Sequence, residues 1–210
     1  AWLYLFSKSL SPLSHSYGAN RGEPLDRYFI EKFLSENKGS IQGTCLEIKD
    51  NFYTRKFGNN ITRSDILDID LNNSRANIFD DIRDLRKISD SSYDCIILTQ
   101  VLQFIDDYQS AVKECYRILK PGGTILVTLP SISRIDIRSG VDNDYWRFTT
   151  ASARYIFSKL FKNPDIKSWG NVRSGLAFWI GMSQDEMSAR ELNYNDSNFP
   201  VIITVKATRN

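Results

Sequence analysis

The sequence predicts a single α/β domain in which helices cover both faces of an open, mostly parallel sheet. Short apolar segments alternate along the chain with segments of helical periodicity, the pattern of βαβ units joined by right-handed crossovers. One apolar segment, Cys95-Ile96-Ile97-Leu98, has no polar alternation, as expected of a strand buried on both faces. The length of 210 residues fits one domain better than two. We therefore expect a doubly wound α/β domain.

The first half of the chain contains a helix and three strands. Apolar residues recur at helical spacing over residues 24–36, which predicts an amphipathic helix. Residues 44–48 predict a buried strand that opens onto the polar turn Lys49-Asp50-Asn51. A second strand is expected from Ile61 to Asp70, and a short third strand from Ala76 to Phe79.

The second half begins with the strand of residues 93–99, which we expect at the centre of the sheet. A helix follows from Tyr108 and stops at Lys120-Pro121-Gly122-Gly123, because proline and glycine end helices. The next strand is expected over residues 124–129. Another helix begins near Thr149 and ends before Pro164, and the last strand covers residues 201–205.

Charge and hydropathy argue against several partners. The chain has 27 Lys and Arg residues against 25 Asp and Glu residues, a formal charge of +2, which is too balanced to favour nucleic acid or an anionic membrane. The apolar run Ala1–Phe6 is far shorter than the roughly 20 residues that span a bilayer. We expect no integral membrane segment and no nucleic-acid partner.

Histidine and cysteine usage also limits the chemistry. His15 is the only histidine of the chain, so histidine-based triads and histidine-rich metal sites are poor interpretations, and we expect no metal. The three cysteines, Cys45, Cys95 and Cys115, lie in apolar patterns without C-x-x-C spacing. We expect buried, reduced thiols, which fits a cytoplasmic protein.

Ligands of such sheets bind at the carboxyl ends of the strands. Neither G-x-G-x-x-G nor G-x-x-x-x-G-K-[ST] occurs in the sequence, which argues against dinucleotides and ATP. The first strand instead carries Glu47, and Asp50 lies in the turn after it, so a pyrophosphate would be repelled. The Glu47 carboxylate can accept hydrogen bonds from a ligand ammonium or tie down the next loop. Both roles stay open.

The acids after the next strands fit a nucleoside without phosphates. At the expected end of the second strand, Asp70 is placed to accept hydrogen bonds from both ribose hydroxyls; Asp68 is its close competitor, and a solvated turn aspartate is the alternative. Asp81 and Ile82, after the third strand, offer a carboxylate and backbone groups that can read an adenine edge. These features suggest a ligand such as S-adenosylmethionine.

Four segments carry a family resemblance that runs through the core of the chain. They are Leu46-Glu47-Ile48, then Asp81-Ile82 with Leu85, then Ser92-Tyr93-Asp94-Cys95-Ile96-Ile97-Leu98-Thr99-Gln100-Val101-Leu102, and Arg117-Ile118-Leu119-Lys120-Pro121-Gly122-Gly123. They resemble the successive motifs of class I S-adenosylmethionine-dependent methyltransferases. The resemblance implies a Rossmann-like, doubly wound, seven-stranded sheet and S-adenosyl-L-methionine as cofactor.

Three further segments are similar to one subgroup of that family. They are Arg21-Gly22-x-Pro24-x-Asp26-Arg27-Tyr28, Asp50-Asn51-x-Tyr53-Thr54-Arg55 and Asp144-Tyr145-Trp146-Arg147-Phe148-Thr149. The subgroup is found with, or fused to, bacterial glycosyltransferases that build surface polysaccharides. The resemblance therefore implies an O-methyltransferase for a sugar hydroxyl, with a small-molecule or glycan substrate and a glycosyltransferase as partner or fused domain.

The same resemblance implies an organisation and a set of cofactor residues. Residues 1–40 would form an N-terminal cap, in which Asp26-Arg27-Tyr28 closes the site as a lid or is a plain surface helix. Residues 41–210 would form the core, with an insertion at about 170–200. The implied cofactor residues are Glu47, Lys49, Asp50 and Asn51 for the methionine end, Asp70 for the ribose, Asp81 and Ile82 for the adenine, and Thr99 and Gln100 along the methyl-transfer face.

Two residues depart from the family pattern. Lys49 stands where the family has glycine after the first strand; if its backbone has a positive φ, the substitution costs about 1 kcal/mol or more. Its side chain then either fills part of the pocket or points to solvent. Phe104 replaces a histidine that many relatives carry after the fourth strand, which removes the usual candidate base.

Without a histidine base, the proton of a hydroxyl acceptor must go to a carboxylate or to water. We favour Asp144, with Asp136 and Asp142 open in the same loop. Arg147 would bind an acidic sugar group or a carboxylate of the fold, and the rings of Tyr145 and Trp146 would pack against a pyranose. The alternative is structural, with Trp146 and Phe148 as core anchors and Arg147 pairing Asp144. Two other functions stay open: a non-catalytic docking module, and a methyltransferase for another small molecule.

Overall fold

A computed structural model describes residues 9–210, so the apolar run Ala1–Phe6 lies outside the described residues. The described chain forms one seven-stranded sheet with the strand order β3-β2-β1-β4-β5-β7-β6. Strands β1 to β5 pair in parallel, whereas β7 is antiparallel to both β5 and β6. The strands are β1 (Gly43–Ile48), β2 (Ile61–Asp68), β3 (Ile78–Phe79), β4 (Tyr93–Thr99), β5 (Leu119–Pro130), β6 (Asp165–Trp169) and β7 (Ile202–Thr208). The predicted mostly parallel, doubly wound sheet is confirmed.

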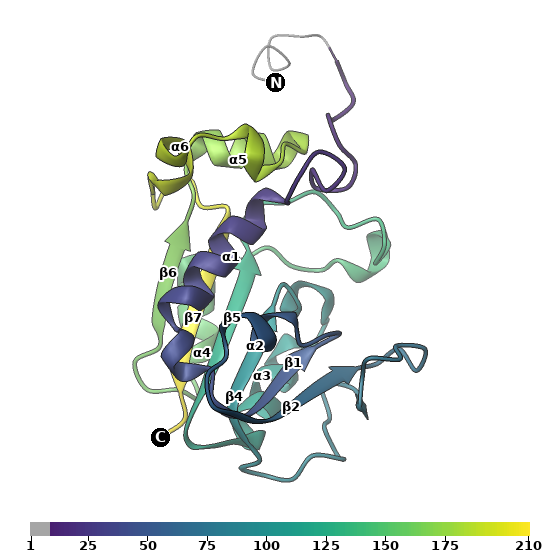
Figure 1. The fold of residues 1–210 in the computed structure, drawn as a ribbon, viewed down its shortest axis with the longest axis vertical. Coiled ribbons are helices and arrows are strands. Elements are labelled where there is room, and N and C mark those ends of the chain that lie inside the picture. The colour runs from purple at the N-terminus through teal and green to yellow at the C-terminus, as the bar shows by residue number, and fades with distance from the viewer. Residues whose placement is uncertain (1–8) are drawn as a thin grey trace.

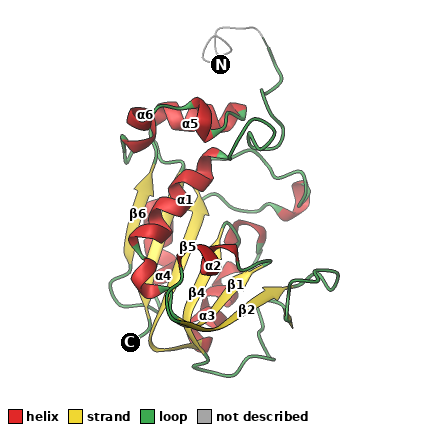
Figure 2. Ribbon diagram, in the orientation of Figure 1, coloured by secondary structure: helices red, strands yellow, loops and turns green. Residues whose placement is uncertain are grey.

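Helices cover both faces of this sheet (Figures 1 and 2). The α-helices are α1 (Leu25–Glu36), α2 (Phe52–Phe57), α3 (Tyr108–Ile118), α4 (Thr150–Phe157), α5 (Val172–Ile180) and α6 (Ala189–Asn193). Short 3-10 helices connect them: η2 (Lys38–Ser40), η3 (Leu102–Phe104), η4 (Val141–Asn143) and η5 (Gln184–Glu186). Buried residues of α1, α2, α5 and α6 form a core cluster on one face, and those of α3 and α4 form another on the opposite face.

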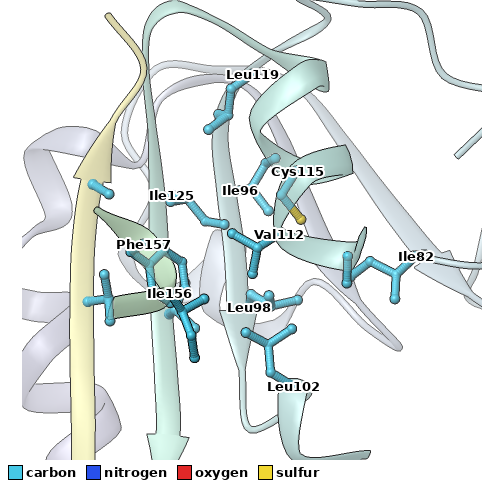
Figure 3. Close-up of a cluster of buried hydrophobic side chains, with 14 of the residues drawn as sticks. Ile82, Ile96, Leu98, Leu102, Val112, Cys115, Leu119, Ile125, Ile156 and Phe157 are labelled. Atoms are coloured by element: carbon cyan, nitrogen blue, oxygen red, sulfur yellow. The ribbon is translucent and has the colours of Figure 1, made fainter. Parts of the chain in front are cut away.

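Strand β4 lies at the centre of the sheet, as predicted. Its residues alternate between the two core clusters: Ile96 and Leu98 pack with α3 and α4, whereas Cys95 and Ile97 pack on the α1 side. Figure 3 shows the first cluster, in which Val112 of α3 and Phe157 of α4 pack beside Ile96 and Leu98. Because both faces of β4 are covered, both need apolar side chains.

Several elements differ from the sequence prediction. The prediction that the second strand runs to Asp70 is wrong, because β2 ends at Asp68, where the Asp70 amide donates to Asp68 Oδ1 at 3.1 Å and turns the chain away. The predicted strand 124–129 is longer, since pairing with β4 begins at Leu119. The turn after β1 leads directly into α2, a short helix that the sequence analysis missed.

The segment between β6 and β7 packs on the α1 side of the sheet. Ala177 and Phe178 of α5 and Leu192 of α6 are buried in the cluster that also contains Phe29 of α1.

All three cysteines are buried and free, as predicted. Among residues 9–210, no helix is long and apolar enough to cross a membrane.

Candidate active site

The turn after β1 has a left-handed backbone. Lys49 has φ +69°, a conformation that costs a non-glycine residue about 1–2 kcal/mol. The Lys49 amide donates to the Leu67 carbonyl oxygen at 3.0 Å, and its own carbonyl oxygen accepts from Asn73 Nδ2 at 2.7 Å. The Lys49 side chain is exposed. The backbone therefore adopts the shape that glycine would favour, and two hydrogen bonds hold it there.

Glu47 ties this turn to α2. It is 3% exposed, and its carboxylate accepts hydrogen bonds from the amides of Tyr53 and Thr54 at 3.0 and 2.8 Å and from Thr54 Oγ1 at 2.8 Å. Burial raises the pKa of Glu47, against the effect of these hydrogen bonds. In this geometry Glu47 holds down the next loop. Asp50 Oδ1 accepts from the Phe52 amide at 3.0 Å, and Asn51 Nδ2 donates to Ser64 Oγ at 3.1 Å.

At the end of β2, two aspartates occupy different environments. Asp68 is 6% exposed and accepts from Asn73 Nδ2 at 2.7 Å, whereas Asp70 is exposed and accepts from the amide and the side chain of Asn72. Between them, the apolar side chain of Ile69 is 69% exposed. Asp70 was chosen for the ribose because it was expected at the end of the second strand. In the structure, Asp68 occupies that strand-end position.

The residues after β3 play two separate parts. Arg83 binds Asp81 through Nη2 at 2.6 Å and also reaches Asp106 through Nη1 at 2.6 Å. The hydrogen bonds from Arg83 lower the pKa of Asp81. Ile82 is buried in the core cluster that also contains Leu98 and Leu102 (Figure 3). Only the Asp81 carboxylate and the backbone of this segment are therefore placed to meet a ligand.

The end of β4 forms a second strained turn. Gln100, which follows Thr99, has φ +53°, and its amide donates to the Thr128 carbonyl oxygen at 3.0 Å. Gln103 is 5% exposed, and its Nε2 donates to the Gln100 carbonyl oxygen at 3.0 Å. The Gln103 carbonyl oxygen accepts from the Tyr145 amide at 2.8 Å. These bonds join the turn after β4 to the loop after β5.

Asp144 and Arg147 form a paired unit in that loop. Arg147 donates from Nη1 to Asp144 Oδ1 at 2.6 Å and from Nη2 to Asp144 Oδ2 at 2.9 Å, and the Asp136 amide also donates to Oδ2 at 2.9 Å. Burial would raise the pKa of Asp144, but the hydrogen bonds from Arg147 and Asp136 outweigh it and lower the pKa. Asp136 is paired with Arg138 at 2.8 Å, and Asp142 is exposed. The geometry matches the structural pairing left open by the sequence analysis.

The aromatic residues of the same loop are only partly available. Trp146 donates from Nε1 to the Ile105 carbonyl oxygen at 2.9 Å and packs edge-on against Tyr108 with ring centroids 5.2 Å apart. Phe148 is buried in the core, whereas Tyr145 is 45% exposed. Trp146 is therefore held by the fold but stays partly exposed, and the Tyr145 ring is more accessible to a ligand.

The N-terminal segment lies against this loop. The Arg134 guanidinium stacks on the Tyr17 ring with 3.9 Å to the centroid and also donates to the His15 carbonyl oxygen. The Tyr17 ring stacks on Phe178 of α5 with centroids 5.6 Å apart. Residues before α1 therefore cover the loop after β5, at the carboxyl end of the sheet.

The structure gathers the predicted residues at one edge of the sheet, since the parallel strands β1, β2, β3 and β4 all end there (Figure 1). Two surface hollows of about 720 and 530 Å³ lie along α4 and β6 instead, so the candidate site rests on the strand-end residues.

Within residues 9–210 no cluster of three or more His, Cys, Asp or Glu side chains is arranged to hold a metal. The apolar Ile69 was not predicted as a site residue, although its place between the acids Asp68 and Asp70 was a signal in the sequence.

Comparisons with known proteins agree with this architecture. Residues 43–127 match a family model described as "Methyltransferase domain", and these residues include β1 to β4 and most of β5. A protein of Bradyrhizobium japonicum, the N-methyltransferase NodS in complex with S-adenosyl-L-homocysteine, has a similar structure with a TM-score of 0.57 at 14% identity, covering 94% of this chain and 93% of that one. The chain thus has the fold of class I methyltransferases.

Two curated relatives match shorter segments. One is named "Probable S-adenosylmethionine-dependent methyltransferase", from Mycolicibacterium smegmatis, with 36% identity over 63 residues, 30% of this chain and 24% of the relative. The other is the demethylmenaquinone methyltransferase of Staphylococcus epidermidis, with 31% identity over 81 residues, 38% of this chain and 32% of the relative. The chain spans at most about a third of the curated relatives described here.

Proposed function

We propose that this protein is an S-adenosylmethionine-dependent methyltransferase. The observation that carries the proposal is the match of residues 43–127 to a methyltransferase domain, because this segment supplies the strand ends where a doubly wound sheet binds its ligand. The residues fit the cofactor chemically. A left-handed turn at Lys49 and the acids Asp68 and Asp81 suit a ligand with hydroxyl and amino donors and a cationic sulfur.

For the cofactor we propose one subsite per strand end. The turn Lys49–Asn51 holds the methionine end by its backbone, while Glu47 keeps that turn in place through α2. Asp68 accepts hydrogen bonds from the ribose hydroxyls, with Asp70 as the alternative residue. Exposed Ile69 and the backbone and carboxylate of Asp81–Ile82 receive the adenine, and Thr99 and Gln100 line the methyl-transfer face.

The cofactor supplies an electrophilic methyl group on sulfur, so the protein must position a nucleophile in line with it and exclude water. The strained Gln100 turn and the 144–147 segment are joined by the bond from the Tyr145 amide to the Gln103 carbonyl oxygen. The ion pair between Asp144 and Arg147 holds the 144–147 segment in its conformation. A carboxylate with a lowered pKa is a weak base, so we propose that Asp144 and Arg147 position the loop. The proton of the acceptor hydroxyl is then taken by the exposed Asp142 or by water.

For the acceptor we propose a sugar hydroxyl in polysaccharide or glycoconjugate biosynthesis, with a glycosyltransferase as partner or fused domain. The support is the resemblance of Asp144–Thr149 to the glycosyltransferase-associated subgroup and the partly exposed rings of Tyr145 and Trp146, which suit packing against a pyranose. The three free thiols are consistent with a cytoplasmic site of action. Methylation of another small molecule, or a non-catalytic docking role, are the competing functions.

Calorimetric titration with S-adenosylmethionine and S-adenosylhomocysteine tests the enzyme proposal. Binding in the micromolar range supports it, and absence of binding at millimolar ligand supports the docking module. Transfer of a labelled methyl group to a panel of glycans and to a quinol acceptor then separates the acceptor classes. Methylation of the quinol with none of the glycans would overturn the sugar proposal.

A further inference from the structure

Gln103 carries a buried side-chain oxygen that lacks a hydrogen-bond donor. The residue is 5% exposed, and its Oε1 has no partner within residues 9–210. The Nε2 of the same amide is engaged, because it donates to the Gln100 carbonyl oxygen at 3.0 Å and to Gln100 Oε1 at 3.3 Å. A buried acceptor without a donor destabilises the fold, so a native structure that keeps one has a reason for it.

The position of Gln103 relates this oxygen to methyl transfer. Its side chain is held against Gln100, in the strained turn that we place at the methyl-transfer face. Its main-chain carbonyl oxygen accepts from the amides of Tyr145 and Trp146 at 2.8 and 3.3 Å. The unsatisfied oxygen therefore belongs to a residue that contacts both the turn after β4 and the 144–147 segment.

Arg147, the cation of that segment, has no N–H group left for a ligand. A guanidinium has five N–H donors. In Arg147, Nε donates to the Ser133 carbonyl oxygen at 3.3 Å, and Nη1 donates to Asp144 Oδ1 and the Trp146 carbonyl oxygen at 2.6 and 2.7 Å. Its Nη2 donates to the Arg134 carbonyl oxygen and to Asp144 Oδ2, both at 2.9 Å. The acidic sugar group that the sequence analysis offered as a partner therefore finds no free donor on Arg147.

The two other arginines of the loop after β5 are also engaged. Arg138 donates from Nε and Nη2 to the Asp136 carboxylate at 3.1 and 2.8 Å. Arg134 donates from Nη1 to the Ile135 carbonyl oxygen at 2.8 Å, and its guanidinium lies 3.9 Å from the centroid of the Tyr17 ring, against the N-terminal segment. Its Nε is a buried donor without a partner among the described residues, so an anion on Arg134 is the competing arrangement.

We propose that Gln103 selects a neutral acceptor by accepting a hydrogen bond from one of its hydroxyl groups through Oε1. This inference rests on the proposed function and narrows the substrate class to sugars without an acidic group. A hydroxyl supplies the missing donor and brings no charge that the engaged arginines would have to pair. Because Oε1 is enclosed in this structure, the acceptor reaches it as the side chains around it open on binding. The bond then contributes to the affinity for the acceptor and not to that for the cofactor.

The first test uses the wild-type chain and acceptors that differ in charge. Transfer of a labelled methyl group is measured to oligosaccharides that end in a hexose, in the corresponding hexuronic acid, or in the primary amide of that acid. The acid and its amide have nearly the same shape, so charge is what separates them. The hexose and the amide should each exceed the acid about tenfold or more in kcat/KM. An acid that is methylated as well as its amide overturns the inference, and an acid that is preferred assigns recognition to Arg134.

The second test changes Gln103 itself. Gln103→Met replaces the amide by an apolar side chain of similar length, and Gln109→Met makes the same change at an exposed glutamine of α3. Gln103→Met should raise KM for the better neutral acceptor about tenfold or more and leave the affinity for S-adenosylhomocysteine within about twofold. Gln109→Met should change neither. A purely structural role, in which Nε2 holds the Gln100 turn, would weaken S-adenosylhomocysteine as well, and that result overturns the inference.

The remaining outcomes separate this inference from the proposed function. An unchanged KM in Gln103→Met overturns the role of Oε1 while the methyltransferase proposal stands. If the wild-type chain binds S-adenosylhomocysteine and methylates none of the three acceptors, the neutral-sugar inference fails alone. If the wild-type chain binds no cofactor, the proposed function itself fails, and the inference fails with it.

Discussion

Arg147 binds Asp144 through two parallel hydrogen bonds, from Nη1 to Oδ1 at 2.6 Å and from Nη2 to Oδ2 at 2.9 Å. Arg147 also donates to the carbonyl oxygens of Ser133 and Arg134. The pair therefore closes the loop that begins after β5 and returns at α4. Two parallel hydrogen bonds fix the relative orientation of the two side chains as well as stabilising the pair. This suits residues that hold the loop after β5 in one conformation.

We predict that Asp144→Asn destabilises the fold. The Asp144 side chain is only 2% exposed, and losing its charge leaves the guanidinium without its counter-ion, at a cost of about 1–3 kcal/mol. Urea unfolding measures the change. Arg147→Lys is the companion variant, since lysine keeps the charge but loses the two-pronged geometry. Unchanged stability in Asp144→Asn with a hundredfold loss of turnover would instead make Asp144 the general base.

Asp68 and Asp70 give a paired prediction for the ribose. Asp68→Asn should weaken S-adenosylhomocysteine about 10- to 100-fold, because hydrogen bonds to a charged group contribute about 1.5–3 kcal/mol. Asp70→Asn should change the affinity less than threefold, since Asp70 lies beyond the strand in an exposed turn. Calorimetry on both variants decides, and the reverse order of effects would return the ribose to Asp70. Circular dichroism checks that Asp68→Asn remains folded.

The sequence predicted the sheet well because the elements that build it have strong local patterns. Residues 93–99 are apolar on both faces, and Lys120-Pro121-Gly122-Gly123 lies just beyond the end of α3. It did not predict α2, whose six residues are too few for a helical period. The end of β2 was placed two residues too late, because Ile69 continues the apolar alternation while the turn at Asp68 depends on a side-chain hydrogen bond.

The candidate site was harder to predict than the fold. The sequence left two roles for Glu47, and only the three-dimensional structure shows its carboxylate on the amides of α2. It likewise left Asp144 as base or ion-pair partner, which depends on the position of Arg147 in space. The charges of Asp26 and Tyr53 interact although Tyr53 lies in α2, 27 residues further along the chain, so no local pattern could reveal this pairing.

Lys49→Gly should stabilise the protein without changing cofactor affinity. Relief of the left-handed backbone at φ +69° is partly offset by the entropy of glycine, so we expect a gain of about 0.5–1 kcal/mol. The Lys49 side chain is exposed, and S-adenosylhomocysteine affinity should stay within threefold. Asn60→Gly, at φ +52° before β2, is the control remote from the strand ends. A tenfold gain in affinity for Lys49→Gly alone would show that lysine obstructs the pocket.

Asp26 gives the fold a pH dependence that Asp26→Asn should remove. Its folded pKa of about 6 lies above the ordinary value of 3.8, so the native state binds the proton more tightly, and this stabilising contribution is lost as the pH rises through 4 to 6. At pH 7.5, Asp26→Asn should therefore be more stable than the wild type, by about 1–2 kcal/mol once partial exposure is allowed for. At pH 4 the two should be nearly equal, since both side chains are then neutral in the native state. Urea unfolding of both proteins at the two pH values measures the difference in their free energies of unfolding. If that difference is the same at both pH values, the ionisation of Asp26 is not what destabilises the wild type.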